Sequence, residues 1–254
     1  MDATKFITAS EASSETFKTA SLLKSLDVNA LILGEDGVGK RTLASFVMPD
    51  APIIDASHYG EVLTQIENLS EIIILNIDNF ANIKRLVEIL KEREIRVMAT
   101  AKPSFASEIL DEIFSIKFDI PPLSQREEDV VELIGMFVQN AVDIFGGESK
   151  FDTTNFQPDL SDNANSLRRQ VMIHYLLQDI DDYELMQIIE NYLMDKLGSN
   201  SDYRNFLYLY EVPLIRAGFA KFKSQLQLSD KLGLNRNTLR KKIADNKKYL
   251  QGER

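Results

Sequence analysis

The sequence contains no cysteine and only two histidines. Without cysteine the chain can form no disulfide, no thiolate metal site and no thiol nucleophile. His58 and His174 lie far apart in the sequence and lack the spacing of metal ligands, so we expect both to be ordinary surface or boundary residues. The chemistry of this protein must therefore come from other side chains.

Long apolar runs are also missing. No apolar segment approaches eighteen residues, so no membrane span is expected. The first ten residues, MDATKFITAS, lack the charged start and apolar core of a secretion signal, and we expect a cytoplasmic protein. With 254 residues, of which 44% are hydrophobic, the chain is long enough to form two compact units.

The first half of the sequence alternates short apolar segments with helical ones. After a helical stretch at 10–26, strands are predicted at 29–33, 51–55, 71–77, 95–99 and 116–120. This alternation favours an α/β fold in which helices cover a mainly parallel sheet. The rest of the sequence is helical, with predicted helices at 127–145, 167–177, 183–197 and 205–222 and a linker at 198–202.

The run GEDGVGK at residues 34–40 follows the first predicted strand and precedes a helix, as a phosphate-binding loop does. Glycines let backbone N–H groups wrap a phosphate chain, and the lysine neutralises the phosphates. Arg41 follows the lysine where Ser or Thr is usual, so the magnesium-binding hydroxyl is displaced to Thr42. The alternative is a glycine-rich turn without a ligand. The predicted nucleotide-binding residues of this segment are Gly34, Asp36, Gly37, Val38, Gly39, Lys40, Arg41 and Thr42.

The apolar run at 71–77 leads into Asp78, and the pattern resembles a Walker B strand. Asp78 and Thr42 are the predicted magnesium-binding residues. Asn79 stands where a glutamate would activate water, and an amide cannot act as a base, so we expect very poor turnover. The alternative role of Asp78 is to cap a following helix.

The last fifty residues have the pattern of a helix-turn-helix. Leu228 and Leu239 mark the apolar faces of two short helices, Gly233 stands at the turn, and Asn235 is a suitable N-cap for the second helix. From residue 219 onward the chain has ten Lys or Arg and three Asp or Glu, a net charge of +7, which leaves −17 for residues 1–218. A basic end predicts double-stranded DNA as a partner, and the acidic body suits a protein partner. The alternative is a solvated basic tail.

Helical geometry places the predicted DNA contacts on the second helix. Asn237 and Arg240 are the candidates for hydrogen bonds to base edges, because Leu239 and Ile243 must face inward. Phosphate contacts are expected from Lys241, Lys242 and Lys247, and the predicted set is completed by Asn235, Arg236 and Thr238.

Several of these segments together resemble the NtrC-type, sigma-54-dependent activators. The resemblance rests on the phosphate loop, on PPLSQREEDV at 121–130, on NSLRR at 165–169, and on PLIRA at 213–217 with NRNTLRKK at 235–242. It implies a AAA+ domain at 1–122, a helical lid at 123–198 and an all-α, Fis-type helix-turn-helix domain at 203–254. It also implies ATP or ADP with Mg²⁺ as ligand, Arg168 as a phosphate sensor, Lys102 at the polar sensor position, and a homodimer formed through the C-terminal domain.

Departures from the family pattern limit the expected activity. The sequence lacks the GAFTGA loop that contacts the sigma factor, lacks an arginine at 110–117, and has Asn79 in place of the catalytic glutamate. We therefore predict a sequence-specific DNA-binding transcription regulator with a degenerate AAA+ domain, unable to activate the sigma-54 holoenzyme and not an efficient enzyme. The alternatives are an active ATPase anchored to DNA and a nucleoid-type structural DNA-binding protein.

Overall fold

The computed structural model describes residues 5–58, 60, 66, 69–105, 108–148, 150–154 and 156–250. The chain divides into two compact units, Met1–Ile180 and Asp181–Arg254, and each is described by itself. Among the described helices, none combines the length and the apolar character that a membrane span requires.

The N-terminal unit is built on a five-stranded parallel sheet with the strand order β2-β3-β4-β1-β5. Side chains alternate between its two faces, as the pleat requires. On β3, Ile72 and Ile74 point to one face and Ile73 to the other. The strands are β1 (Ala30–Leu33), β2 (Ile53–Asp55), β3 (Glu71–Leu75), β4 (Arg96–Ala101) and β5 (Ile116–Asp119).

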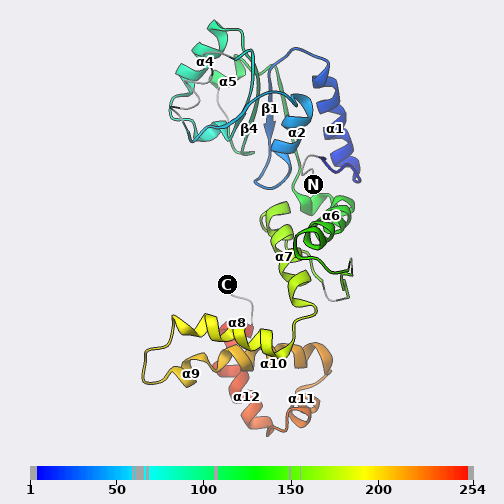
Figure 1. The fold of residues 1–254 in the computed structure, drawn as a ribbon, viewed down its shortest axis with the longest axis vertical. Coiled ribbons are helices and arrows are strands. Elements are labelled where there is room, and N and C mark those ends of the chain that lie inside the picture. The colour runs from blue at the N-terminus through cyan, green and yellow to red at the C-terminus, as the bar shows by residue number, and fades with distance from the viewer. Residues whose placement is uncertain are drawn as a thin grey trace. The chain divides into compact units, whose positions relative to one another are not determined.

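Helices cover both faces of this sheet (Figure 1). One face packs against α1 (Glu11–Lys24) and α2 (Lys40–Val47), and the other packs against α4 (Ile83–Glu92) and α5 (Glu108–Asp111). Ser10 caps α1, because its side chain accepts a hydrogen bond from the backbone N–H of Ser13. The short 3₁₀ helix η1 (Ile77–Asn79) follows β3. Because the strands are parallel, the carboxyl-terminal ends of β1, β3 and β4 lie on the same side of the sheet.

A helical lid completes the N-terminal unit. It consists of α6 (Glu127–Phe145) and α7 (Asn163–Leu177), which pack together through a small core that includes Phe137 and Val171, and η2 (Leu123–Gln125) leads into it. The observed α6 has the same bounds as the predicted helix at 127–145. The observed α7 begins four residues before the predicted one.

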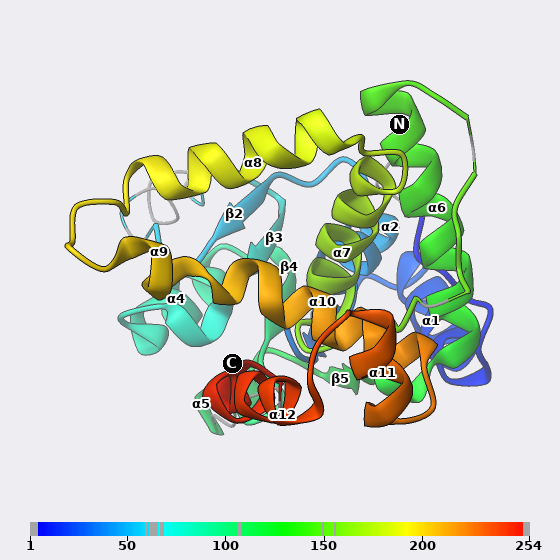
Figure 2. The same cartoon turned by 90° about the horizontal axis from the view of Figure 1, so that it is seen from below.

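In the C-terminal unit, the regular elements described up to residue 250 are all helices. They are α8 (Asp182–Met194), α9 (Asp202–Phe206), α10 (Tyr208–Lys221), α11 (Gln225–Lys231), α12 (Arg236–Asp245) and α13 (Lys247–Leu250). Figure 2 shows α8 and α10 as two longer helices connected through α9. The predicted helix at 205–222 is thus observed as the end of α9 followed by α10.

The division between the units falls earlier in the chain than the boundary that we expected. Residues 181–198 were assigned to the lid, but in the structure α8 groups with the C-terminal helices. Asp181 and Glu184 form a capping box at the start of α8, which is a strong local signal for a new helix. Tyr208 of α10 connects α8 to the rest of this unit, because its hydroxyl forms a hydrogen bond with Tyr192 of α8. This hydrogen bond, together with burial and with Tyr249, raises the pKa of Tyr208 to about 12. The rings of Tyr208 and Tyr249 are stacked, with 4.5 Å between their centroids.

Candidate functional site

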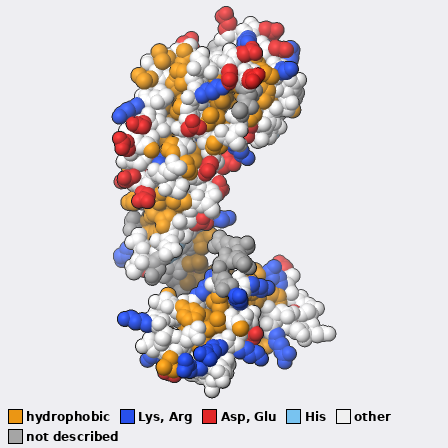
Figure 3. All heavy atoms as spheres, turned by 180° about the vertical axis from the view of Figure 1, so that it is seen from behind, with side chains coloured by type: hydrophobic (Ala, Val, Ile, Leu, Met, Phe, Trp, Pro, Cys, Tyr) orange, Lys and Arg blue, Asp and Glu red, His pale blue; other side chains and the backbone are white. Residues whose placement is uncertain are grey.

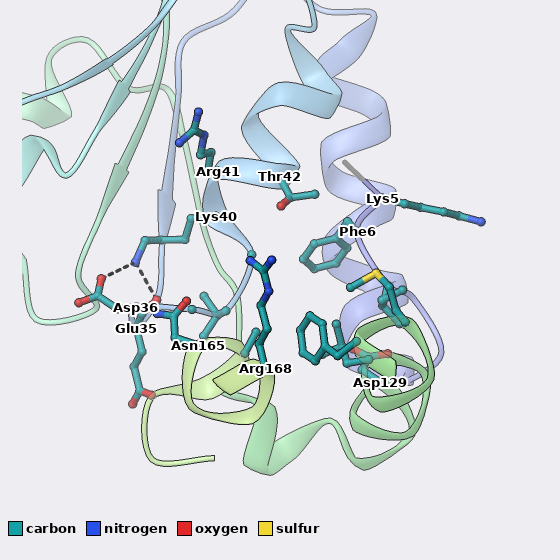
Figure 4. Close-up of a pocket in the computed structure, with 18 of the residues that line it drawn as sticks. Lys5, Phe6, Glu35, Asp36, Lys40, Arg41, Thr42, Asp129, Asn165 and Arg168 are labelled. Carbon is teal, nitrogen blue, oxygen red and sulfur yellow. Dashed lines mark hydrogen bonds and ion pairs between the residues drawn. The ribbon is translucent and has the colours of Figure 1, made fainter. Parts of the chain in front are cut away.

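A cavity of about 720 Å³ lies where the phosphate loop, the sheet edge and the lid meet (Figure 4). Its polar part is lined by Lys40, Arg41, Thr42, Asn76, Thr100 and Arg168. Its apolar part is lined by Phe6, Ile7, Leu133, Met136 and Phe137. A cavity of this size, with one polar and one apolar part, suits a small molecule that has a charged end and a flat apolar end.

Two glycines of the loop at 34–40 have backbone conformations that other residues rarely adopt. Gly37 and Gly39 have φ values of 75° and 105°, which side-chain-bearing residues rarely adopt. A Cβ on Gly37 would lie 2.6 Å from the carbonyl oxygen of Asp162, and one on Gly39 would lie 3.0 Å from the ring of Phe6. Gly39 precedes α2, and no described side chain caps that helix, so its first N–H groups are available to an anion.

Lys40 is held inside this loop. Its ammonium donates to the carbonyl oxygens of Gly34 at 2.6 Å and Glu35 at 2.7 Å, and it lies 3.6 Å from the Asp36 carboxylate. The side chain is only 8% exposed. Burial lowers the pKa of Lys40 from its ordinary value of 10.5, although Asp36 acts in the opposite direction. In this structure the ammonium of Lys40 is thus engaged by groups of the loop itself.

Asn76, which the sequence analysis did not single out, occupies the position directly after β3 and lines the cavity. Its backbone N–H donates to the hydroxyl of Thr100 at 2.9 Å, and its side-chain amide donates to Asp55 at 2.7 Å. Thr100 is buried on β4, two residues before the predicted sensor Lys102. The only sequence signal for Asn76 is that it is the first polar residue after an apolar strand.

The predicted magnesium ligand Asp78 lies two residues further along, within η1. It is close enough to influence Lys40 electrostatically, but it is not among the described residues that line the cavity. One of its carboxylate oxygens is buried without a hydrogen-bond partner in the described part of the chain. The alternative role as a helix cap is not observed, since Asn82 caps α4.

The lid contributes Arg168 to the same cavity, as the resemblance implied. Figure 4 shows its side chain extending from α7 toward the loop. Asn163, at the start of α7, connects the lid to the loop: its amide donates to Glu35 and to the backbone oxygen of Asp36, both at 2.9 Å. It also accepts a hydrogen bond from the backbone N–H of Leu123 at 2.8 Å.

A buried ion pair between Arg126 and Asp129 contacts the loop at 34–40. Arg126 donates to the backbone oxygen of Val38 at 3.0 Å and lies 3.5 Å from Asp129, which is fully buried. Asp129 also accepts hydrogen bonds from Ser10 at 2.8 Å and Ser13 at 3.0 Å. Burial lowers the pKa of Arg126, and Asp129 opposes that effect. This network explains part of the PPLSQREEDV motif structurally.

The helices α11 and α12 form a second candidate site, in the C-terminal unit. Their core contains Ile215, Leu228 and Leu239, with Leu232 and Ile243 packed against it. Gly233 has a φ of 63° at the turn, and the Asn235 side chain accepts the backbone N–H of Asn237 at 2.9 Å. The predicted inward orientation of Leu239 and Ile243 is therefore observed.

Most of the predicted DNA-contacting side chains are exposed on and beside α12. The exposed set comprises Asn235, Arg236, Asn237, Thr238, Arg240, Lys241 and Lys247. Lys242 differs, because it is half-buried and donates to Glu211 of α10, which also accepts a hydrogen bond from Asn246 at 3.1 Å. Its expected phosphate contact would require breaking this ion pair. Figure 3 shows Lys and Arg side chains gathered on the C-terminal unit and acidic ones spread over the N-terminal unit.

No protein-family model matches the chain. A protein named limonene hydroxylase, from Geobacillus stearothermophilus, is 23% identical over an alignment 305 residues long. The alignment covers 94% of this chain and 56% of that protein. The chain thus spans about half the length of this curated relative.

Two similar solved structures are those of NtrX from Brucella abortus. The complex with ADP has a TM-score of 0.63 and 14% identity, and the match covers 96% of this chain and 69% of that one. The complex with ATP has a TM-score of 0.58 and 15% identity, with 95% and 69% covered. At these identities the likeness shows the fold alone, which in the N-terminal unit is a five-stranded parallel sheet covered by helices.

Proposed function

We propose that this protein is a sequence-specific DNA-binding transcription regulator with an AAA+ body that binds an adenine nucleotide and hydrolyses it poorly. The observation that carries the proposal is the face of α12, where Asn237, Arg240 and Lys241 are exposed while Leu239 is buried. A capped helix with amide and guanidinium groups on its outer face matches the chemistry of the major groove.

The nucleotide part of the proposal follows from the cavity. Its polar part offers Lys40, Arg168 and the free N–H groups of α2 to phosphates, and its apolar part offers Ile7 and Met136 to a base. NtrX was crystallised with ATP and with ADP, which supports the same ligand class here. Poor hydrolysis is part of the proposal because Asn79 stands where the sequence pattern places a glutamate that activates water. Asn76 and Ile77, which directly follow β3, carry no carboxylate either.

Homodimerisation through the C-terminal unit is part of the proposal. None of the residues of α8 is buried, although the helix carries many large apolar side chains. Those more than a third exposed are Tyr183, Leu185, Met186, Ile188, Ile189, Tyr192 and Met194, and Phe219 of α10 is 41% exposed. A second copy of this unit would cover such a face and place two α12 helices on one DNA duplex. The acidic N-terminal unit remains available to a protein partner.

Binding to labelled duplexes, measured by fluorescence anisotropy, tests the DNA part. Duplexes recovered by genome-wide footprinting should bind at least tenfold more tightly than scrambled ones at physiological salt. Arg240→Ala should cost about 1–3 kcal/mol on the recovered site. Lys18→Ala, which removes an exposed charge from α1, serves as the matched control and should change nothing. Absence of salt-sensitive binding to any duplex would refute the proposal.

The same assays separate the alternatives. Equal affinity for recovered and scrambled duplexes would indicate a nucleoid-type structural protein instead. Steady phosphate release from ATP that disappears in Lys40→Ala would indicate an active ATPase anchored to DNA. We expect neither result.

A further inference from the structure

We propose that the nucleotide site works without a magnesium ion, and that Arg41 supplies the positive charge that the metal supplies in other P-loop sites. The inference rests on the nucleotide binding proposed above and specifies its ligand as a metal-free nucleoside diphosphate. It departs from the magnesium site expected from the sequence, which consisted of Thr42 and Asp78.

The positions that hold magnesium in P-loop sites carry unsuitable groups here. The metal is usually bound by a Ser or Thr hydroxyl directly after the loop lysine and by an aspartate on the neighbouring strand. Arg41 occupies the first position, and a guanidinium has no lone pair to offer. Asn76 directly follows β3 and offers only a neutral amide oxygen, because its NH₂ group donates to Asp55. This donor set does not fit a hard divalent cation, which prefers carboxylates.

The other candidate ligands do not complete a magnesium site. Asp78 has one buried carboxylate oxygen without a partner among the described residues, but it is not among the residues that line the cavity. Thr42 is one residue further along α2, which turns its side chain by about 100° around the helix axis. Figure 4 shows Thr42 on the side of Phe6 and Arg41 on the other side. Asp55 is already engaged by hydrogen bonds from Ser57 and Asn76.

The cavity instead brings its own positive charge. Lys40, Arg41 and Arg168 all line it, together with the carboxylates of Glu35, Asp36, Asp129 and Asp143. Lys40 is paired with Asp36, whereas within the described residues no carboxylate pairs with Arg41 or Arg168. The two arginines are therefore the cations that the phosphates of a nucleoside diphosphate can engage. An arginine also binds two phosphate oxygens at once, which a hydroxyl cannot do.

Calorimetric titration of the full chain with ADP, once with excess MgCl₂ and once with EDTA, tests the inference. We expect ADP to bind at least as tightly in EDTA as in magnesium. Arg41→Ala should weaken binding about tenfold or more in EDTA, because a charge-assisted contact is lost. Lys18→Ala is the matched control, and the Kd should stay the same.

A second variant tests the metal ligands directly. Arg41→Thr combined with Asn76→Asp restores a hydroxyl and a carboxylate, and ADP binding by this double variant should become tighter with magnesium than with EDTA. A circular-dichroism melt identifies a variant that has not folded; Arg41→Thr alone, on the exposed surface of α2, then carries the test and should bind ADP more weakly than the wild type in EDTA.

The outcomes are distinct. ADP binding that appears with magnesium and is at least tenfold weaker in EDTA overturns the inference and leaves the proposed function intact. Binding that is unchanged in Arg41→Ala also overturns it. No heat of binding in either buffer overturns both the inference and the nucleotide part of the proposed function.

Discussion

Lys40 makes the nucleotide affinity depend on pH on the alkaline side. Burial lowers the pKa of Lys40 below 10.5, so in the free protein the ammonium loses its proton before an ordinary lysine does. Phosphate binding favours the charged form, and affinity for ADP should therefore fall as the pH rises through this lowered pKa. Titrations at increasing pH would show the decline, and Lys40→Arg should not show it, because arginine stays charged.

The same shift has an opposite consequence for stability. A lysine whose folded-state pKa is lowered disfavours folding while it is protonated in both states. The N-terminal unit should therefore gain stability as the pH rises from the lowered pKa of Lys40 toward 10.5. For the affinity prediction of the preceding paragraph, an ADP affinity that stays constant up to pH 10.5 would contradict the buried environment assigned to Lys40.

Asp129 is the residue whose loss should damage the N-terminal unit most. It is fully buried and balances Arg126, so Asp129→Ala leaves a buried guanidinium without its counter-charge. We expect a loss of about 3–5 kcal/mol in the free energy of unfolding, measured by urea denaturation. Asp143→Asn, on the exposed side of the same helix, is the control and should change stability by less than about 0.5 kcal/mol.

Individual site residues were predictable where the local sequence dictates the backbone. Gly37, Gly39 and Lys40, which line the cavity, could be singled out because strand, loop and helix follow one another, and Arg168 could be singled out through the resemblance. Gly34 is not among the residues that line the cavity. Asn76 and Thr100 were missed, because the sequence does not show that β3 ends at Leu75 and that Asn76 turns with a φ of 55°. The sequence pattern favoured Asp78 as the metal ligand because it is an acidic residue after an apolar strand, but Asp78 is not among the residues that line the cavity.

At the level of elements, the contact between α10 and α11 depends on Gly218. A Cβ at this position would lie 2.3 Å from the Cδ1 atom of Leu228, which is fully buried. Gly218→Ala should therefore destabilise the C-terminal unit by about 1–3 kcal/mol despite the better helix propensity of alanine. Thermal melting measures this effect.

Gly135 provides the matched comparison. It lies on the exposed side of α6, and an added Cβ would meet no described atom within 4 Å. Gly135→Ala should raise the stability of the N-terminal unit by up to about 1 kcal/mol. If both substitutions shift stability in the same direction, the proposed clash at Gly218 is wrong.

Elements with a clear period and clear ends were predicted well. The three acidic residues at the start of α6 and the glycines after it define a helix that the sequence reveals fully. The long helix predicted at 205–222 was less accurate, since Leu207 ends α9 and precedes α10 in the structure. The sequence alone could not show that α8 belongs to the C-terminal unit, because an amphipathic pattern does not indicate which part of the protein the apolar face packs against.

For the whole molecule, the exposed apolar face of α8 predicts a dimer in solution. Ile188→Asp places a charge among these side chains and should convert the dimer into a monomer, as measured by sedimentation equilibrium. Glu190→Asp on the same helix keeps its charge and is the control. A wild-type protein that sediments as a monomer at all concentrations would rule out this interface.

The basic face predicts how DNA affinity responds to salt. Lys241 is exposed, so Lys241→Ala should reduce the slope of log K against log salt concentration by about 1. Lys242 is engaged with Glu211, and Lys242→Ala should lower the melting temperature of the C-terminal unit while leaving the slope unchanged. Equal slope changes in the two variants would show that the ion pair opens on DNA.

The hydrogen bonds of Asn163 limit how the nucleotide site can open. Its amide connects the phosphate loop to α7 and to η2, and the backbone N–H of Ala164 donates to Gly37 at 3.2 Å. Movement of α7 away from the loop would have to break all of these hydrogen bonds together, so the loop and the first turn of α7 should keep their relative positions when the rest of the lid moves.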